Sequence, residues 1–419
     1  MKLLLLALAL QITAPAVPAP PSPIGRTIDV PIDHVHPELG TAPLYFELGA
    51  PFDEAKPTLI VVADGQQFHV HRGAMAALQR SLTGDDTNVI GIVGRGFTPE
   101  ITKLAVGADG RTDWRKAWQL FNQNQWIEDI EDVRKAVVGA KGTVLLYGAS
   151  GGASLVHHYL LHHGDFVTRA YTESPGNSFM NGELGITSDH FWSEIGESDP
   201  TLRPLLLQAL AKHPAQRLRI LLTIQRQHFF VTDDSLPDAR ATLIRALAGG
   251  DDTVLEAAAK EYQVDPIIDY FTSAAGAAIA VREFELIYPT GGFDAVSDAT
   301  VHPYIEAMLH FTKPLVELAR AGAIAMPPND FTAAHRLDTE VFLMVSRWDE
   351  AADYRTAIAL AYSYPRHALF IADDNHVFAK LTKSGLRQRF PRTFLSHGLN
   401  SAELRALLSQ AKPYRWREQ

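Results

Sequence analysis

The sequence predicts an α/β fold with a mostly parallel sheet, helices on both of its faces and a helical cap inserted into it. Short, almost wholly apolar runs, such as 58–63 and 88–93, are typical of strands covered on both faces. Helical stretches alternate with such runs up to residue 175 and again from residue 336. Residues 176–335 lack this alternation and are largely helical. We therefore expect a core of residues 26–175 and 336–419, with residues 176–335 as the cap.

The composition is that of an ordinary globular protein. Of the 419 residues, 46% are hydrophobic and 21% are charged, and the net charge is −10. No cluster of Lys and Arg offsets this negative charge, which argues against nucleic acid as a partner. There is no Cys, so packing rather than disulfides must stabilise the fold.

The N-terminus has the pattern of a secretory signal. Lys2 precedes an unbroken apolar run, Leu3 to Leu10, and Ala14-Pro15-Ala16 supplies a small-x-small cleavage motif. Cleavage after Ala16 and after Ala19 are both consistent with this pattern, and we assign residues 1–19 to the signal peptide and 20–25 to a linker. The apolar run is too short to span a bilayer, so no stable membrane insertion is expected. The pattern predicts a secreted or periplasmic protein.

The strands of the core can be placed from residue patterns. Residues 26–33 alternate between apolar and polar, as in a half-buried strand, and 43–48 is expected to pair with it in antiparallel fashion. Further strands are expected at 58–63, 88–93, 144–147, 166–172, 340–345 and 368–371. A helix is expected at 126–138, with its acidic residues Glu128, Asp129, Glu131 and Asp132 on a solvated face.

A strand, a tight turn and a helix meet at Ser150. The apolar run Val144–Tyr147 is followed by Gly148-Ala149-Ser150-Gly151-Gly152 and then by a helical stretch. This Gly-x-Ser-x-Gly turn is expected to hold Ser150 in a strained conformation above the sheet, because only small neighbours let the strand and helix approach so closely. Ser150 is therefore the candidate nucleophile; the alternative is a glycine-rich turn with a capping serine.

A serine nucleophile needs a base and an orienting carboxylate, and both candidates follow the last two strands. Asp349 comes after the strand at 340–345, and His376 after the strand at 368–371. The order Ser150, Asp349, His376 is that of α/β-hydrolases. Glu350 and Asp353 remain alternatives to Asp349, and His376 could instead be a histidine of a surface loop.

The oxyanion hole needs two backbone donors. One is expected to be the N–H of Gly151, at the start of the helix after Ser150. The other is expected from Gly65 or Gln66, in the loop after the strand at 58–63. The alternative is that Gly65 only makes a turn.

Neither a metal nor another cofactor is expected. His157, His158, His162 and His163 cluster on the helix behind Ser150, and His158 and His162 have the spacing of metal ligands on one helix face. No Cys or paired carboxylates accompany them, so exposed helix-face histidines explain the cluster better.

Together these residues resemble the prolyl aminopeptidase and tripeptidyl aminopeptidase family of α/β-hydrolases. The motifs that carry the resemblance are 26–33, Gly94-Arg95-Gly96, the helix at 127–137, Gly148–Gly152, Asp349 and His376. They cover the core on both sides of the cap, whereas the cap matches only loosely. The resemblance implies a serine exopeptidase that releases residues from peptide N-termini, with a cap carboxylate that pairs with the free α-amino group of the substrate.

The cap segment 278–283 resembles the one that carries this carboxylate, which makes Glu283 the candidate and Glu285 the reserve. A helix-surface ion pair of Glu283 with Arg282 or a neighbouring residue is the alternative. The chain departs from the family in the oxyanion loop, which usually has His-Gly-Gly-Pro-Gly and here has Ala63-Asp64-Gly65-Gln66-Gln67.

The sequence thus predicts a serine hydrolase that works through an acyl-enzyme, most simply an aminopeptidase, with a peptide or small acyl compound as its substrate. An esterase or lactonase on the same triad, or a catalytically silent protein of this fold that binds a peptide or protein, remains an alternative. The oligomeric state stays open.

Overall fold

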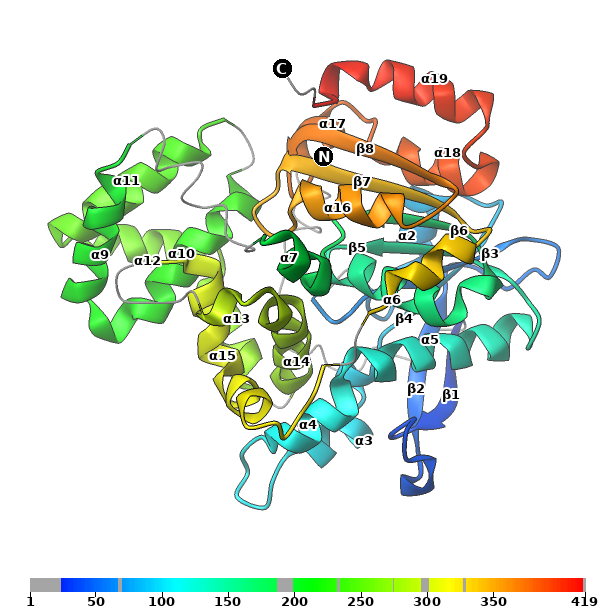
Figure 1. Cartoon of the computed structure of the whole chain (residues 1–419), viewed down its shortest axis with the longest axis horizontal. Coiled ribbons are helices and arrows are strands. Elements are labelled where there is room, and N and C mark those ends of the chain that lie inside the picture. Colours follow the sequence, from blue (N-terminus) through cyan, green and yellow to red (C-terminus); the bar gives the residue numbers. More distant parts are fainter. Residues whose placement is uncertain are drawn as a thin grey trace.

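The computed structural model describes residues 24–66, 70–186, 199–231, 234–273, 275–294, 301–326 and 329–416 (Figure 1). The expected signal peptide, 1–19, lies outside these residues, as does most of the linker at 20–25. Gly25, expected in the linker, already belongs to the first strand.

An eight-stranded sheet forms the centre of the molecule (Figure 1). Its strands are β1 (Gly25–Pro31), β2 (Thr41–Leu48), β3 (Thr58–Val62), β4 (Asn88–Ile92), β5 (Val144–Ala149), β6 (Val167–Glu173), β7 (Glu340–Trp348) and β8 (His367–Asn375). Their order across the sheet is β1-β2-β4-β3-β5-β6-β7-β8. The β1–β2 and β2–β4 pairs are antiparallel, as expected for β1 and β2, and all later pairs are parallel.

Helices cover both faces of this sheet because its central strands are apolar on both sides. In β3, Ile60 and Val62 belong to one core cluster, whereas Leu59 and Val61 belong to another on the opposite face. The helices of the α/β core are α2 (Met75–Leu82), α3 (Pro99–Thr102), α4 (Trp114–Phe121), α5 (Gln123–Val138), α6 (Gly151–His163), α16 (Tyr354–Tyr362), α17 (Ala379–Lys383), α18 (Arg389–His397) and α19 (Ala402–Gln410). Of these, α6 and α16 pack on the strands from one face, and α2 and α18 from the other.

This arrangement is the α/β-hydrolase fold, and it confirms the predicted fold class. Two strands run further than the apolar pattern indicated: β7 ends at Trp348 and β8 at Asn375. Asp349 and His376 therefore follow directly after the carboxyl ends of two neighbouring parallel strands, where the active sites of open α/β sheets lie.

Between β6 and β7 the chain forms a set of helices that packs against the carboxyl ends of the strands. They are α7 (Ser178–Leu184), α9 (Leu202–Lys212), α10 (Arg217–Phe230), α11 (Leu236–Gly249), α12 (Asp252–Glu261), α13 (Val264–Thr272), α14 (Gly276–Ile287) and α15 (Pro303–Arg320). Figure 1 shows α13, α14 and α15 between the α/β core and the outer helices α9 to α12. We call this set the cap helices. Packing of α14 on both α4 and α15 joins them to the core.

The acidic residues of α5 are not all on a solvated face, contrary to expectation. Asp129 and Glu131 are each only 2% exposed. Asp129 accepts two hydrogen bonds of 2.8 Å from the buried guanidinium of Arg95, and Glu131 is paired with Arg134. Arg95, in the Gly94-Arg95-Gly96 segment, thus fastens the loop after β4 to α5.

Within the described ranges, no single helix is both long and apolar enough to cross a membrane. One bent pair, Val264–Thr272 with Gly276–Thr290, has the length and composition when the two parts are taken together, with an angle of 100° between them.

Candidate active site

Ser150 lies in the strained turn that the sequence predicts. It separates β5 from α6 and has φ 53° and ψ −125°, a conformation that non-glycine residues rarely adopt. Its own N–H donates a 2.8 Å hydrogen bond to the carbonyl of Glu173 at the end of β6, which holds the turn against the sheet. Any Cβ at Gly148 would lie 2.6 Å from the carbonyl oxygen of Gly152, so this position must be glycine.

His376 and Asp349 form a close pair. The Nδ1 atom of His376 lies 2.8 and 2.9 Å from the two carboxylate oxygens of Asp349. Asp349 is 3% exposed and also accepts the N–H groups of Ala351 and Ala352. Burial raises the pKa of this carboxyl, but the charge and hydrogen bond of His376 outweigh burial and leave the pKa below its usual value. Asp349 is therefore an ionised acceptor that fixes the orientation of the imidazole.

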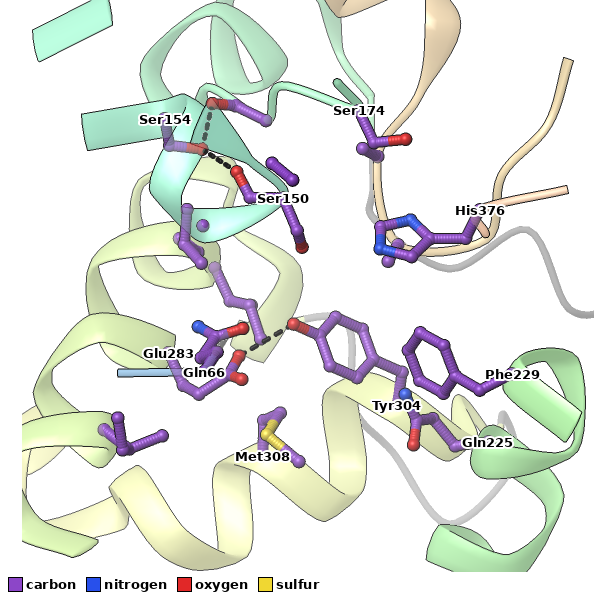
Figure 2. A pocket seen from close by; sticks show the side chains of 18 of the residues that line it. Gln66, Ser150, Ser154, Ser174, Gln225, Phe229, Glu283, Tyr304, Met308 and His376 are labelled. Atoms are coloured by element: carbon purple, nitrogen blue, oxygen red, sulfur yellow. Dashed lines mark hydrogen bonds between the residues drawn. The ribbon is translucent and has the colours of Figure 1, made fainter. Parts of the chain in front are cut away.

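The ring of His376 faces Ser150. Both residues line a pocket between the core and the cap helices, and Figure 2 shows their side chains turned toward one another at one end of it. Among the described residues the Ser150 hydroxyl makes no hydrogen bond, and such contacts commonly tighten only when substrate binds. The ring of Phe229, from α10, stands edge-to-face against His376 with 5.5 Å between centroids and limits its movement.

The two alternative carboxylates are engaged elsewhere. Glu350 is paired with the buried guanidinium of Arg240, at 2.5 Å. Asp353 caps α16 by accepting the N–H of Arg355 at 2.7 Å. The structure thus brings Asp349, and not these neighbours, to His376.

The expected oxyanion-hole residues are placed differently from one another. Gly151 starts α6 and lines the pocket, so its N–H belongs to the unsatisfied first turn of the helix. Gln66 also lines the pocket, but its N–H donates a 3.0 Å hydrogen bond to Asp64 Oδ1 and is occupied in this conformation. Gly65 has φ +91° and does not line the pocket. Gly151 is the donor that the geometry supports best.

A carboxylate from the cap helices reaches the same pocket. Glu283, on α14, is 6% exposed and accepts a 2.7 Å hydrogen bond from the hydroxyl of Tyr304, on α15 (Figure 2). Burial raises the pKa of Glu283 to about 7; the charge of Asp64 adds to this effect, whereas Tyr304 and Arg282 oppose it. A cationic group beside Glu283 would reverse the shift and hold the carboxylate ionised.

Glu285 and Arg282 lie away from the pocket. Arg282 is paired with Glu285, and its Nε atom lies 3.7 Å from Asp64 Oδ2. Glu285 also accepts the N–H of Gln123 at 2.8 Å, and burial raises its pKa to about 7. Arg282 therefore does not form the surface ion pair with Glu283 that was the alternative. Glu285 is held in a buried ion pair with Arg282 and does not line the pocket.

The pocket has a cavity volume of about 180 Å³ and combines core and cap residues. Ser150 and His376 lie at one end of it (Figure 2), and Gly151 also lines it. Its lining from the cap helices is largely apolar and comprises Leu222, Phe229, Ile267, Phe271, Ile279, Leu286, Ile287 and Met308, with the polar residues Asn181, Gln225, Arg226, Tyr270, Glu283 and Tyr304.

Sequence reasoning missed Tyr304 and Arg226. Tyr304 gives no local signal, because its partner Glu283 is on another helix. Arg226 does leave one: it lies four residues after Leu222 and three before Phe229, so a charged residue interrupts a stripe of apolar residues on α10.

Two of the four histidines of α6, His157 and His158, are buried, contrary to expectation, whereas His162 is exposed as expected and His163 is half-buried. His157 contacts the hydroxyl of Tyr364 at 2.8 Å, and His158 contacts Asn124 at 2.8 Å. Burial lowers the pKa of each to about 3, so both are neutral parts of the core. Within the described residues, no group of three or more His, Cys, Asp or Glu side chains is placed to hold a metal ion.

No protein-family model matches this chain, and no curated protein matches it either. Solved structures with a similar fold include a homoserine O-acetyltransferase from Staphylococcus aureus, with 14% identity and a TM-score of 0.48, over 92% of this chain and 99% of that one. A serine hydrolase from Cycloclasticus zankles has 13% identity and a TM-score of 0.42, over 90% of this chain and 100% of that one. An acetylester hydrolase from Corynebacterium glutamicum has 13% identity and a TM-score of 0.41, over 84% and 90%. These likenesses concern the fold alone.

Proposed function

We propose that this protein is a serine hydrolase that works through an acyl-enzyme. Ser150 is the nucleophile, and His376 is the general base and then the general acid. Asp349 fixes the orientation of the imidazole of His376 and stabilises the imidazolium that forms. The observation that carries this proposal is the His376–Asp349 pair, which presents the ring of His376 to a serine held in a strained turn.

Each step of this chemistry has a group in the pocket. When His376 takes the proton of Ser150, the serine oxygen attacks the carbonyl carbon of the substrate. The resulting oxyanion is stabilised by the N–H of Gly151, at the positive end of α6. His376 then gives its proton to the leaving group, and water, activated in the same way, hydrolyses the acyl-enzyme.

We propose further that the substrate carries a free amine, as an aminopeptidase substrate does. A buried carboxylate that shares a pocket with the nucleophile favours an ammonium group and disfavours neutral or anionic groups at the same place. Glu283 is such a carboxylate, and the hydrogen bond from Tyr304 fixes one of its oxygens. The N-terminal pattern of the sequence adds the proposal that the enzyme is secreted or periplasmic.

Labelling with a fluorophosphonate tests the hydrolase proposal. The wild-type protein should be modified, because an activated serine attacks phosphorus, and Ser150→Ala should not. Ser154→Ala is the matched control, since Ser154 lies one turn further along the same helix and donates its hydroxyl hydrogen to the carbonyl of Gly176. It should still be labelled. A wild-type protein that resists labelling would favour a catalytically silent binding protein.

A further inference from the structure

Arg226 is a buried guanidinium in the wall of the pocket. It lies on α10 and is only 1% exposed. Its Nε atom donates a hydrogen bond to the carbonyl of Tyr262, and its guanidinium carbon lies 5.3 Å from the ring centroid of Phe230. These contacts fix the side chain but bring no negative charge to it.

Other large buried arginines of the described chain each have a carboxylate partner. The pairs are Arg95 with Asp129, Arg134 with Glu131, Arg240 with Glu350 and Arg282 with Glu285. Arg226 has no carboxylate partner among the described residues, and its Nη2 atom is buried without a hydrogen-bond partner. Arg226 therefore differs from these paired arginines because no described carboxylate balances its positive charge.

The carboxylate of the pocket does not neutralise Arg226. Among the described residues, the charges that shift the pKa of Glu283 are those of Asp64 and Arg282, and none shifts the pKa of Arg226. The two side chains thus serve separate parts of the pocket. Burial alone lowers the pKa of Arg226 to about 9, which leaves the guanidinium charged at neutral pH.

An unpaired buried charge is costly, and the cost falls when a ligand supplies the opposite charge. The planar guanidinium, with its parallel N–H groups, matches a carboxylate in particular, because it can bind both oxygens. The Nη2 atom of Arg226 makes no hydrogen bond within the described ranges, so a ligand could bind it without displacing a described partner, and the residue lines the space in which the substrate would lie.

We propose that Arg226 binds a carboxylate of the substrate. The inference rests on the proposed hydrolase function and narrows its substrate class to short peptides that carry an amine for Glu283 and a carboxylate for Arg226. The carboxylate can come from the free C-terminus of the peptide or from an Asp or Glu side chain. The small cavity suits short peptides rather than folded proteins.

The test compares matched substrates that differ only in this charge. One series contains peptides of two to four residues, each as the free acid and as the C-terminal amide. A second series contains amidated peptides that differ by Asp or Asn, or by Glu or Gln. In one series or the other, the wild-type enzyme should prefer the acid by about tenfold to a hundredfold in kcat/KM, mainly through KM. The series that shows the preference identifies the source of the carboxylate.

Variants at Arg226 complete the test. Arg226→Gln and Arg226→Met should bring the ratio of acid to neutral substrate close to one, whereas Arg226→Lys should retain part of it. Arg219→Gln is the matched control, because Arg219 lies on the same helix but pairs with Glu256 and Asp265 outside the pocket. It should keep the wild-type ratio. Equal kcat/KM for acid and neutral substrates in the wild-type enzyme, or an unchanged ratio in Arg226→Gln, would overturn the proposal.

Calorimetric binding separates this inference from the hydrolase proposal. The Ser150→Ala variant should bind the preferred peptide acid more tightly than its neutral partner, and the additional change Arg226→Gln should remove the difference. If the wild-type protein is not labelled by fluorophosphonate but the Ser150→Ala variant shows this difference in binding, the hydrolase proposal is disproved and the carboxylate site is supported. A labelled protein without the difference would disprove the carboxylate site alone.

Discussion

The hydroxyl of Tyr304 donates a hydrogen bond to Glu283 Oε2 over 2.7 Å, and both side chains line the pocket that contains Ser150. The two residues come from different cap helices, α14 and α15, so the bond positions the carboxylate within the pocket. This pair is the physical basis for the proposed preference for a free amine.

The first prediction concerns that preference. Wild-type enzyme should cleave a free-amine aminoacyl amide and spare its N-acetylated form, because acetylation removes the charge that Glu283 would bind. Glu283→Gln should reduce kcat/KM for the free amine by about tenfold to a hundredfold and leave the acetylated form little changed. Glu317→Gln, an exposed position on α15, is the control and should behave as wild type. Equal cleavage of both substrates by the wild-type enzyme would count against a pocket for the free amine.

The second prediction concerns stability and pH. The pKa of Glu283 is raised from its ordinary value of 4.5 to about 7, so the folded state favours the protonated form. This stabilisation is complete below pH 4.5 and is lost as the pH rises through 7. Glu283→Gln has no proton to lose, so its free energy of unfolding should exceed that of the wild type by up to roughly 3 kcal/mol at pH 8. The two proteins should be similar at pH 4.5. Thermal unfolding across this range measures the difference, and a constant difference would contradict the prediction.

The third prediction concerns the carboxylate that orients His376. Asp349→Asn should lower kcat by roughly 10³- to 10⁴-fold, because an amide favours the wrong tautomer of the imidazole. Asp373→Asn is the matched control: Asp373 lies on the neighbouring strand and accepts the indole N–H of Trp348 instead. Its activity should stay close to that of the wild type. A small effect of Asp349→Asn would mean that another group orients the histidine.

The fourth prediction concerns the close approach of Asp64 to the first residue of α6. A Cβ at Gly151 would lie 1.9 Å from Asp64 Oδ2, and Asp64 is held by the N–H of Gln66. Gly151→Ala should therefore destabilise the fold by about 1–3 kcal/mol and slow fluorophosphonate labelling. Gly249→Ala serves as a control, since a Cβ there meets no atom within 4 Å. Normal labelling and stability of Gly151→Ala would show that Asp64 can move aside.

The sheet and the three catalytic candidates could be predicted because their signals are local. The apolar run of β5 directly precedes the glycines around Ser150. Asp349 and His376 each directly follow a strand, β7 and β8 respectively. Because β7 and β8 are neighbouring parallel strands, their carboxyl ends lie side by side and bring Asp349 and His376 together. This proximity could be predicted without knowledge of the side-chain packing.

The remaining features depend on contacts between distant residues. His157 is buried because Tyr364 lies against it, and Asp129 is buried because Arg95 neutralises it. Neither partner can be identified from the pattern of α5 or α6 alone. Arg226 shows the converse case, since only the packed structure reveals that no carboxylate in the described part of the chain pairs with it.

The position of the cap helices in the chain determines when, during synthesis, the proposed catalytic residues can come together. They are inserted between β6 and β7, so the ribosome completes the turn at Ser150 and all of these helices before it reaches Asp349 and His376. In a nascent or truncated chain that ends before these residues, Ser150 would thus lack the base proposed for it. Under the proposed mechanism, hydrolase activity therefore requires that the final strands have docked, and an unfinished polypeptide would lack it.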